Sequence, residues 1–268
     1  MNDEQALVIA LSLTSTFAAG LAVEPATEPA PIARHRVVAI AIAGAVVLPL
    51  VAWLLHRTLA LGAAGIGVLV ASAVPGGSTG PLLAVAAGGD ASTAARLFVV
   101  LSSLGTVGAI ASIVALDAFD PRLVARASAT ATAASFVPLL LGLAVRRWWP
   151  RWADVLARPA ARVGLALLIA TVALLAVRYG EQAEVVVLLE STLIVLASLA
   201  PALLVHGRRQ RIAVAQIGAV HNLALALLVL TALEAPPRAT LAVLGYGLVM
   251  YVVTGLLAVL ARARGVPR

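Results

Sequence analysis

The chain has 268 residues, of which 62% are hydrophobic and 12% are charged, and its mean hydropathy is +1.05. This composition excludes an ordinary soluble domain, and the absence of cysteine excludes disulfides, thiolate catalysis and thiolate metal sites. The formal net charge of +7 comes from arginines in short gaps between apolar runs, so it indicates orientation in a membrane and no nucleic-acid partner.

Apolar runs of nearly membrane-spanning length follow one another along the chain, and each approaches the roughly 20 residues that a transmembrane helix needs. The first follows an acidic start, so we expect no cleaved signal peptide. The sequence therefore predicts an all-α polytopic membrane protein with about nine transmembrane helices in the lipid bilayer. The predicted spans are 5–23, 36–55, 59–87, 94–116, 123–145, 161–178, 185–206, 212–233 and 239–261.

The arginines predict how the chain is oriented, because cytoplasmic connections carry an excess of basic residues. Alternate connections and the C-terminal tail hold the larger group: Arg34, Arg36, Arg96, Arg146, Arg147, Arg151, Arg158, Arg162, Arg208, Arg209, Arg211, Arg262, Arg264 and Arg268. The opposite side holds Arg57, Arg122, Arg126, Arg178 and Arg238. We predict a multi-pass protein of a bacterial inner (plasma) membrane, with its N-terminus outside and its C-terminus in the cytoplasm.

The longest predicted connection, 146-RRWWPRWADVLARPAAR-162, mixes Trp and Arg as an interfacial cytoplasmic segment does. It also divides the chain into halves. Within one transporter domain, 1–268, we predict a first repeat over 1–145, which lacks one helix, and a second over 160–262. Five spans separate corresponding helices, and this odd number inverts one repeat relative to the other.

Two spans at corresponding places are interrupted. The third contains 75-PGGSTGP-81, and the eighth contains a polar group around its middle. Paired interruptions of this kind predict a secondary-transporter site at the bilayer midplane. The alternatives are an ordinary loop between two short spans at 75–81 and simple hydrogen bonding between helices by the polar group of the eighth span. The predicted substrate-binding residues are Pro75, Gly76, Gly77, Ser78 and Thr79, which would offer backbone dipoles, and Gln216, Gly218, His221 and Asn222, which would offer side-chain donors and acceptors.

Two titratable residues lie inside apolar spans. Glu190 and His221 are candidates for carrying a coupling proton, since intramembrane ionisable groups often mark transport pathways. Glu190 could instead snorkel to the nearer membrane surface. The sequence has no phosphate-binding loop and no HExxH motif, so we expect neither an ATP-driven pump nor an enzyme, and we predict no cofactor and no metal site.

Several motifs together resemble the bile acid:sodium symporter family. They are 17-FAAGLAV-23, 46-VVLPLVAWLL-55, Pro75-Gly76-Gly77 followed by Gly89-Asp90, and 211-RIAVAQIGAVHNLALAL-227. The resemblance implies two crossing broken helices in a core domain and a flatter panel domain, with substrate between them. Spans 2–4 and 7–9 would form the core, and spans 1, 5 and 6 the panel.

The chain departs from that family where the family places its sodium ligands. The family's Ser-Asn pair falls at Gly80 and Pro81, its hydroxyls in the next helix at Ala94 and Phe98, and its glutamine in the second span at Gly44. Sodium needs several oxygen ligands, so the sequence disfavours sodium coupling.

The sequence thus predicts a secondary transporter that moves a small organic anion or an amphipathic solute by alternating access. One alternative is a polytopic protein with a sensor or assembly role. The other is a proton-coupled carrier or efflux protein of related fold.

Overall fold

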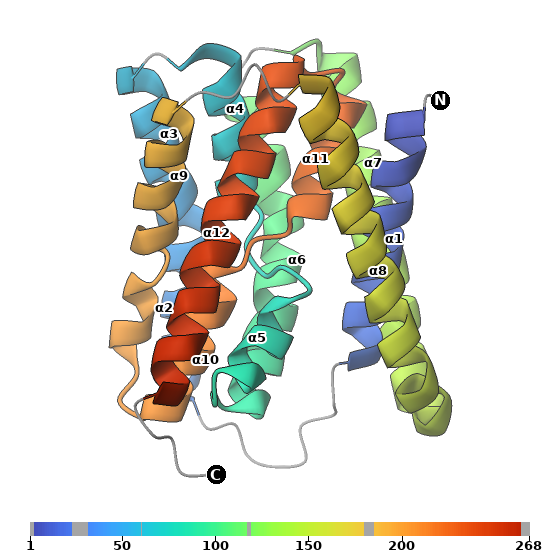
Figure 1. Ribbon diagram of the computed structural model, residues 1–268, viewed down its shortest axis with the longest axis vertical. Coiled ribbons are helices and arrows are strands. Elements are labelled where there is room, and N and C mark those ends of the chain that lie inside the picture. The colour runs from blue at the N-terminus through green and yellow to red at the C-terminus, as the bar shows by residue number, and fades with distance from the viewer. Residues whose placement is uncertain (1–2, 23–31, 60, 117–118, 180–184, 264–268) are drawn as a thin grey trace.

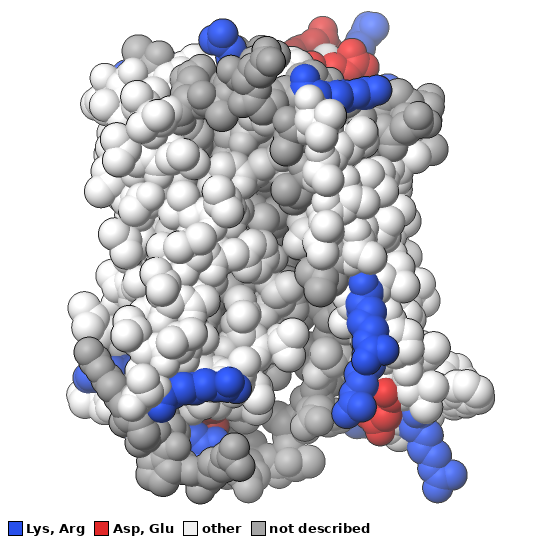
Figure 2. All heavy atoms as spheres, in the orientation of Figure 1, with Lys and Arg blue, Asp and Glu red and all other residues white. Residues whose placement is uncertain are grey.

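The computed structural model (Figure 1) describes residues 3–22, 32–59, 61–116, 119–179 and 185–263. Within these ranges, five helical segments are long and apolar enough to cross a membrane: Arg34–Leu59, Ala91–Ala115, Pro121–Trp148, Val185–Leu204 and Pro237–Ala263. Shorter apolar helices accompany them. Figure 2 shows charged side chains gathered toward both ends of one face, with mainly uncharged side chains between. The all-helical, polytopic membrane fold is therefore confirmed.

The predicted apolar runs each coincide with a helix or a helix pair, whereas the number of membrane crossings stays a prediction. A π-helical turn, Ala43–Val47, and a 3-10 turn, Ala200–Leu204, accompany the α-helices. The helices are α1 (Asp3–Ala22), α2 (Arg34–Ile42), α3 (Leu48–Leu59), α4 (Gly62–Ser72), α5 (Gly80–Ala86), α6 (Ala91–Leu116), α7 (Pro121–Trp148), α8 (Pro150–Tyr179), α9 (Val185–Ala197), α10 (Arg208–Ala219), α11 (Leu223–Ala232) and α12 (Pro237–Ala263).

The segment 146–162 is helical, in contrast to the long connection that we predicted there. Helix α7 continues to Trp148 and α8 begins at Pro150, so only Trp149 separates them. Proline is favoured in the first turn of a helix because its missing N–H would have no partner there. The tryptophans in this region are exposed, as expected for residues near a membrane interface.

Helices α1, α7 and α8 lie side by side and form one group (Figure 1). Glycines allow α1 and α7 to approach closely: a Cβ atom added to Gly20 would lie 2.6 Å from the carbonyl oxygen of Leu139, and one added to Gly142 would lie 2.5 Å from that of Phe17. Small residues permit this kind of close packing between membrane helices.

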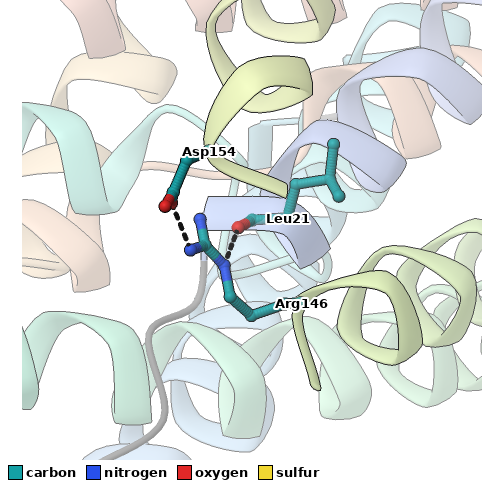
Figure 3. Close-up of polar contacts among 3 residues, drawn as sticks. All are labelled: Leu21, Arg146 and Asp154. Carbon is teal, nitrogen blue, oxygen red and sulfur yellow. Dashed lines mark hydrogen bonds and ion pairs between the residues drawn. The ribbon is translucent and has the colours of Figure 1, made fainter. Parts of the chain in front are cut away.

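Arg146, in the last turn of α7, contacts the end of α1 and the beginning of α8 (Figure 3). Its Nε donates a hydrogen bond to the carbonyl oxygen of Leu21 at 2.6 Å, and its Nη1 pairs with Oδ1 of Asp154 at 2.5 Å. Leu21 lies in the last turn of α1, where carbonyl groups lack partners within the helix. A cation at this end also complements the helix dipole.

The remaining helices form a second group, in which α12 packs against α4 and α9, and α3 packs against α4. Two helix pairs in this group are interrupted near the middle of the molecule. In Figure 1, α4 and α11 occupy the upper half, and α5 and α10 occupy the lower half. The segments that link each pair meet at the site described next.

Candidate functional site

The two unwound segments, 73–79 between α4 and α5 and 220–222 between α10 and α11, pair with each other. The Gly77 N–H donates to the carbonyl oxygen of Val220 at 2.8 Å, and the Asn222 N–H donates to that of Val74 at 2.7 Å. Pro75 and His221 form an antiparallel bridge between these bonds. Backbone groups freed by breaking a helix inside a membrane need partners, and here each interruption supplies partners to the other.

Gly76 and Gly77 suit this pairing because neither position has room for a side chain. Gly76 has φ +80°, a conformation that favours glycine. A Cβ atom there would lie 2.5 Å from the backbone nitrogen of Ser102 on α6. The Ser102 hydroxyl donates to the carbonyl oxygen of Gly76 at 2.6 Å. At Gly77, a Cβ atom would lie 2.9 Å from Cγ1 of Val220. The two glycines therefore let the segment 73–79 lie directly against α6 and against the segment 220–222.

His221 points into the second helix group. It is 2% exposed, and its ring packs edge-on against Tyr246 of α12, with centroids 5.3 Å apart. Its Nδ1 lies 3.0 Å from the carbonyl oxygen of Ala219 and 3.2 Å from the Tyr246 hydroxyl. Its Nε2 is buried and has no hydrogen-bond partner among the described residues. The ring thus joins the unwound segment to α12.

Gln216 and Gly218 also contact neighbouring helices. The Gln216 Nε2 donates to the carbonyl oxygen of Thr254 on α12 at 3.0 Å, and its Oε1 is buried without a partner in the described chain. A Cβ atom at Gly218 would lie 2.9 Å from the carbonyl oxygen of Ser198. Of the residues predicted in the eighth span, these two and His221 therefore lie on the side of α9 and α12.

We call the paired segments 73–79 and 220–222 the crossover. On the other side of the crossover from α12, a small cavity lies between α1 and α7 on one wall and α6 with both unwound segments on the other. Its volume is about 10 Å³, room for roughly one water molecule. Two predicted site residues, Ser78 and Asn222, line it. The remaining lining residues are Thr16, Ala19, Phe98, Ser102, Thr106, Ser135, Phe136 and Leu139.

Apart from Ser78, the hydroxyl residues of this cavity were not predicted as site residues. Thr106 and Ser135 are buried, and neither hydroxyl has a hydrogen-bond partner among the described residues. A serine or threonine inside a helix commonly bonds a carbonyl of the preceding turn, as Ser103 does with Val99 at 2.8 Å. The two unpartnered hydroxyls, which come from α6 and α7, are available to a ligand. The sequence signal was the presence of hydroxyls within the apolar runs of the first and fifth spans, such as Thr16 and Ser135.

Asn222 and Thr79 have structural partners. Asn222 caps α11, its Oδ1 accepting from the Leu225 N–H at 3.1 Å. The Thr79 hydroxyl lies 3.2 Å from that of Tyr251 on α12. The Asn222 amide nitrogen is left for the cavity that this residue lines.

Glu190, the predicted coupling residue of α9, is buried. It is 1% exposed, and neither carboxylate oxygen has a hydrogen-bond partner among the described residues. Helix α9 packs against α3, α4 and α12, so Glu190 lies within the second helix group, away from the hydroxyl-lined cavity. Across the described ranges, no group of three or more His, Cys, Asp or Glu side chains could hold a metal ion.

A polytopic membrane protein with two unwound segments paired at its centre and a polar cavity beside them has the architecture of secondary transporters. The chain belongs to the sodium bile acid symporter family, whose model matches residues 8–188. That match confirms the resemblance, and it covers the Pro-Gly-Gly segment. Residues 211–227 lie beyond it, so the likeness that we inferred there stays a prediction. A search of curated proteins finds no match to this chain.

Proposed function

We propose that this protein is a secondary transporter that moves a small organic anion or an amphipathic solute across the inner membrane by alternating access. One observation carries the proposal: a cavity whose Thr106 and Ser135 hydroxyls have no partner among the described residues lies between the two helix groups, beside the paired unwound segments. Motion of one group against the other would open this cavity toward one side and close it toward the other. The solute would contact Thr106 and Ser135 together with Ser78 and Asn222.

In this proposal α1, α7 and α8 form the panel, and the remaining helices form the core. The close packing of α1 with α7 and α8 supports a panel that moves as a unit. The matching interruptions in α4–α5 and α10–α11 support inverted repeats over 1–145 and 160–262, with about nine membrane crossings. The arginine distribution supports an N-terminus outside and a C-terminus in the cytoplasm.

We further propose that the coupling ion is not sodium. The positions where the family's sodium-binding hydroxyls fall are occupied by Ala94 and Phe98, which are buried and apolar. A proton carried by Glu190 or His221 is the alternative coupling. Glu190 supports it best, because a buried carboxylate without a partner inside a membrane protein marks a functional site by default.

The test is thermal unfolding of the purified protein with taurocholate and smaller organic carboxylates, with and without sodium, at pH 5.5 and 7.5. A ligand that binds only the folded state raises the unfolding temperature. We expect stabilisation by at least one anion without sodium, and loss of that stabilisation in the double variant Thr106→Val, Ser135→Ala. Removing unpartnered buried hydroxyls should not lower the stability of the ligand-free protein, so lost binding can be separated from misfolding.

The matched control is Ser103→Ala, which removes a hydroxyl of α6 that already bonds its own helix. It should respond to the anion as the natural chain does. Unchanged stabilisation of the double variant would show that the cavity is not the binding site. Stabilisation that strictly requires sodium would overturn the proposed coupling, and absence of any response to these anions would contradict the assigned solute class.

A further inference from the structure

A second cavity, of about 240 Å³, lies between α1, α7 and α11, at the end of the molecule where α1 and α7 begin and α11 ends. It is separate from the crossover cavity and shares none of its lining residues. Its wall combines apolar, hydroxyl and charged side chains, including Ile9, Arg126, Thr130, Leu228, Thr231 and Glu234.

The two charged residues of this cavity, Arg126 and Glu234, have opposite signs, and both are exposed. Arg126 comes from α7 and Glu234 from the turn after α11, so the charges stand on different helix groups. Neither side chain forms a hydrogen bond or an ion pair with another residue that the structure describes. A cation and an anion that line one cavity without pairing leave both charges available to a bound molecule.

Glu234 occupies the left-handed backbone position at the end of α11. Its N–H donates to the carbonyl oxygen of Thr231 at 3.2 Å, and the N–H of Ala235 donates to that of Leu230 at 3.0 Å. These two bonds define a Schellman motif, in which the left-handed position is usually glycine. Here it is Glu234, with φ 53°, the one non-glycine residue of the described chain with positive φ. A charged residue in place of glycine at the wall of a cavity motivates a hypothesis of function.

We propose that this cavity binds a small zwitterion, with its anionic group on Arg126 and its ammonium group on Glu234. Arginine presents planar donors that match a carboxylate or phosphate. The Thr130 and Thr231 hydroxyls would add hydrogen bonds, and Ile9 and Leu228 would contact an apolar substituent. The ligand is either a free amino acid or a zwitterionic lipid headgroup, which share this charge pattern. Binding of a zwitterion here is independent of the proposed transport function, in which the solute is an organic anion or an amphipath.

The test is calorimetric binding to the purified full chain with four probes. Leucine has both charges and an apolar side chain, 4-methylpentanoate lacks the ammonium group, and leucinamide lacks the carboxylate. Glycerophosphoethanolamine represents a lipid headgroup. We expect leucine or glycerophosphoethanolamine to bind, with the better of the two identifying the source, and each single-charge analogue to bind about tenfold more weakly or worse.

Variants separate binding from folding. Arg126→Gln and Glu234→Gly should each weaken zwitterion binding about tenfold or more, whereas Arg122→Gln, an exposed arginine on the same end of α7, should leave it unchanged. Glycine relieves the left-handed backbone at position 234, so Glu234→Gly should unfold at the natural temperature or above it. Equal binding of 4-methylpentanoate and leucine, or full binding by Glu234→Gly, would overturn the proposal.

The double variant Thr106→Val, Ser135→Ala tells the two proposals apart. It should bind the zwitterion normally, because neither residue lines this cavity. If no zwitterion binds while the double variant still loses its response to organic anions, the present inference fails and the proposed transport site stands. If the zwitterion binds and no anion response depends on Thr106 and Ser135, the zwitterion site stands and the proposed transport site fails.

Discussion

At Gly76 the backbone conformation and the neighbouring helix both exclude a side chain. The residue has φ +80°, and the Ser102 nitrogen occupies the space where a Cβ atom would lie. We expect Gly76→Ala to lower the free energy of unfolding by about 1–3 kcal/mol, because a left-handed alanine is strained and must displace α6. Unfolding in mixed detergent micelles measures this change.

Gly255 provides the matched control. It lies within α12, and no atom stands within 4 Å of the position where its Cβ would be. Gly255→Ala should raise the free energy of unfolding by about 0.5–1 kcal/mol, because alanine restricts the unfolded chain and favours the helix. Equal effects of the two substitutions would show that the crossover does not require glycine.

Residue types predicted the crossover better than they predicted the cavity. Proline followed by two glycines is a strong local signal for a helix interruption, and the structure has an unwound segment there. His221 was equally conspicuous, yet it packs against Tyr246 on the far side from the cavity. The hydroxyls of Thr106 and Ser135 within apolar runs give only a weak signal, because a hydroxyl in a helix usually bonds its own backbone. Only the packing of α6 against α7 shows that these two have no partner among the described residues.

Among the helices, the group formed by α1, α7 and α8 depends on Arg146, which binds the C-terminal end of α1. The side chain of Arg146 is 11% exposed, whereas that of its second partner, Asp154, is 69% exposed. The ion pair is therefore screened by solvent and contributes little. The bond to the Leu21 carbonyl oxygen is shielded and involves a charged donor, so it should contribute most of the stabilisation.

We expect Arg146→Met to lower the free energy of unfolding by about 1.5–3 kcal/mol, the usual contribution of a hydrogen bond to a charged group. Arg147→Met removes the adjacent, exposed arginine and should change the free energy of unfolding by less than about 0.5 kcal/mol. Unfolding in mixed micelles compares them directly. A smaller effect of Arg146→Met than of Asp154→Asn would mean that the ion pair, and not the helix-end bond, holds the group together.

At the level of helices, hydropathy predicted where each apolar element lies but not how the 146–162 segment is built. Clustered arginines and tryptophans suggested a surface connection, and the structure has two helices with only Trp149 between them. Both conformations place these side chains at an interface, so composition alone could not distinguish them. The resemblance implied that two broken helices cross, but the backbone hydrogen bonds that pair residues 73–79 with 220–222 could not be predicted, because they depend on contacts between segments far apart in the chain.

Across the whole molecule, both cavities lie where α1 and α7 face the second helix group. The crossover cavity holds roughly one water molecule, whereas the second cavity is larger and lies toward one end of the molecule. A volume this small does not admit an organic anion, so the crossover cavity must widen for a solute to bind. Alternating access requires that the same cavity also opens toward each side of the membrane in turn.

The accessibility of a single cysteine at position 135 tests this requirement most directly, because the natural chain has no cysteine and gives no background reaction. Ser135→Cys would be treated with a small, membrane-impermeant methanethiosulfonate reagent in right-side-out and in inverted vesicles. The account predicts modification from both sides, and none for Ala127→Cys, a fully buried residue on the same helix that lines neither cavity. Modification of position 135 from one side only, or from neither side, would contradict alternating access at this site.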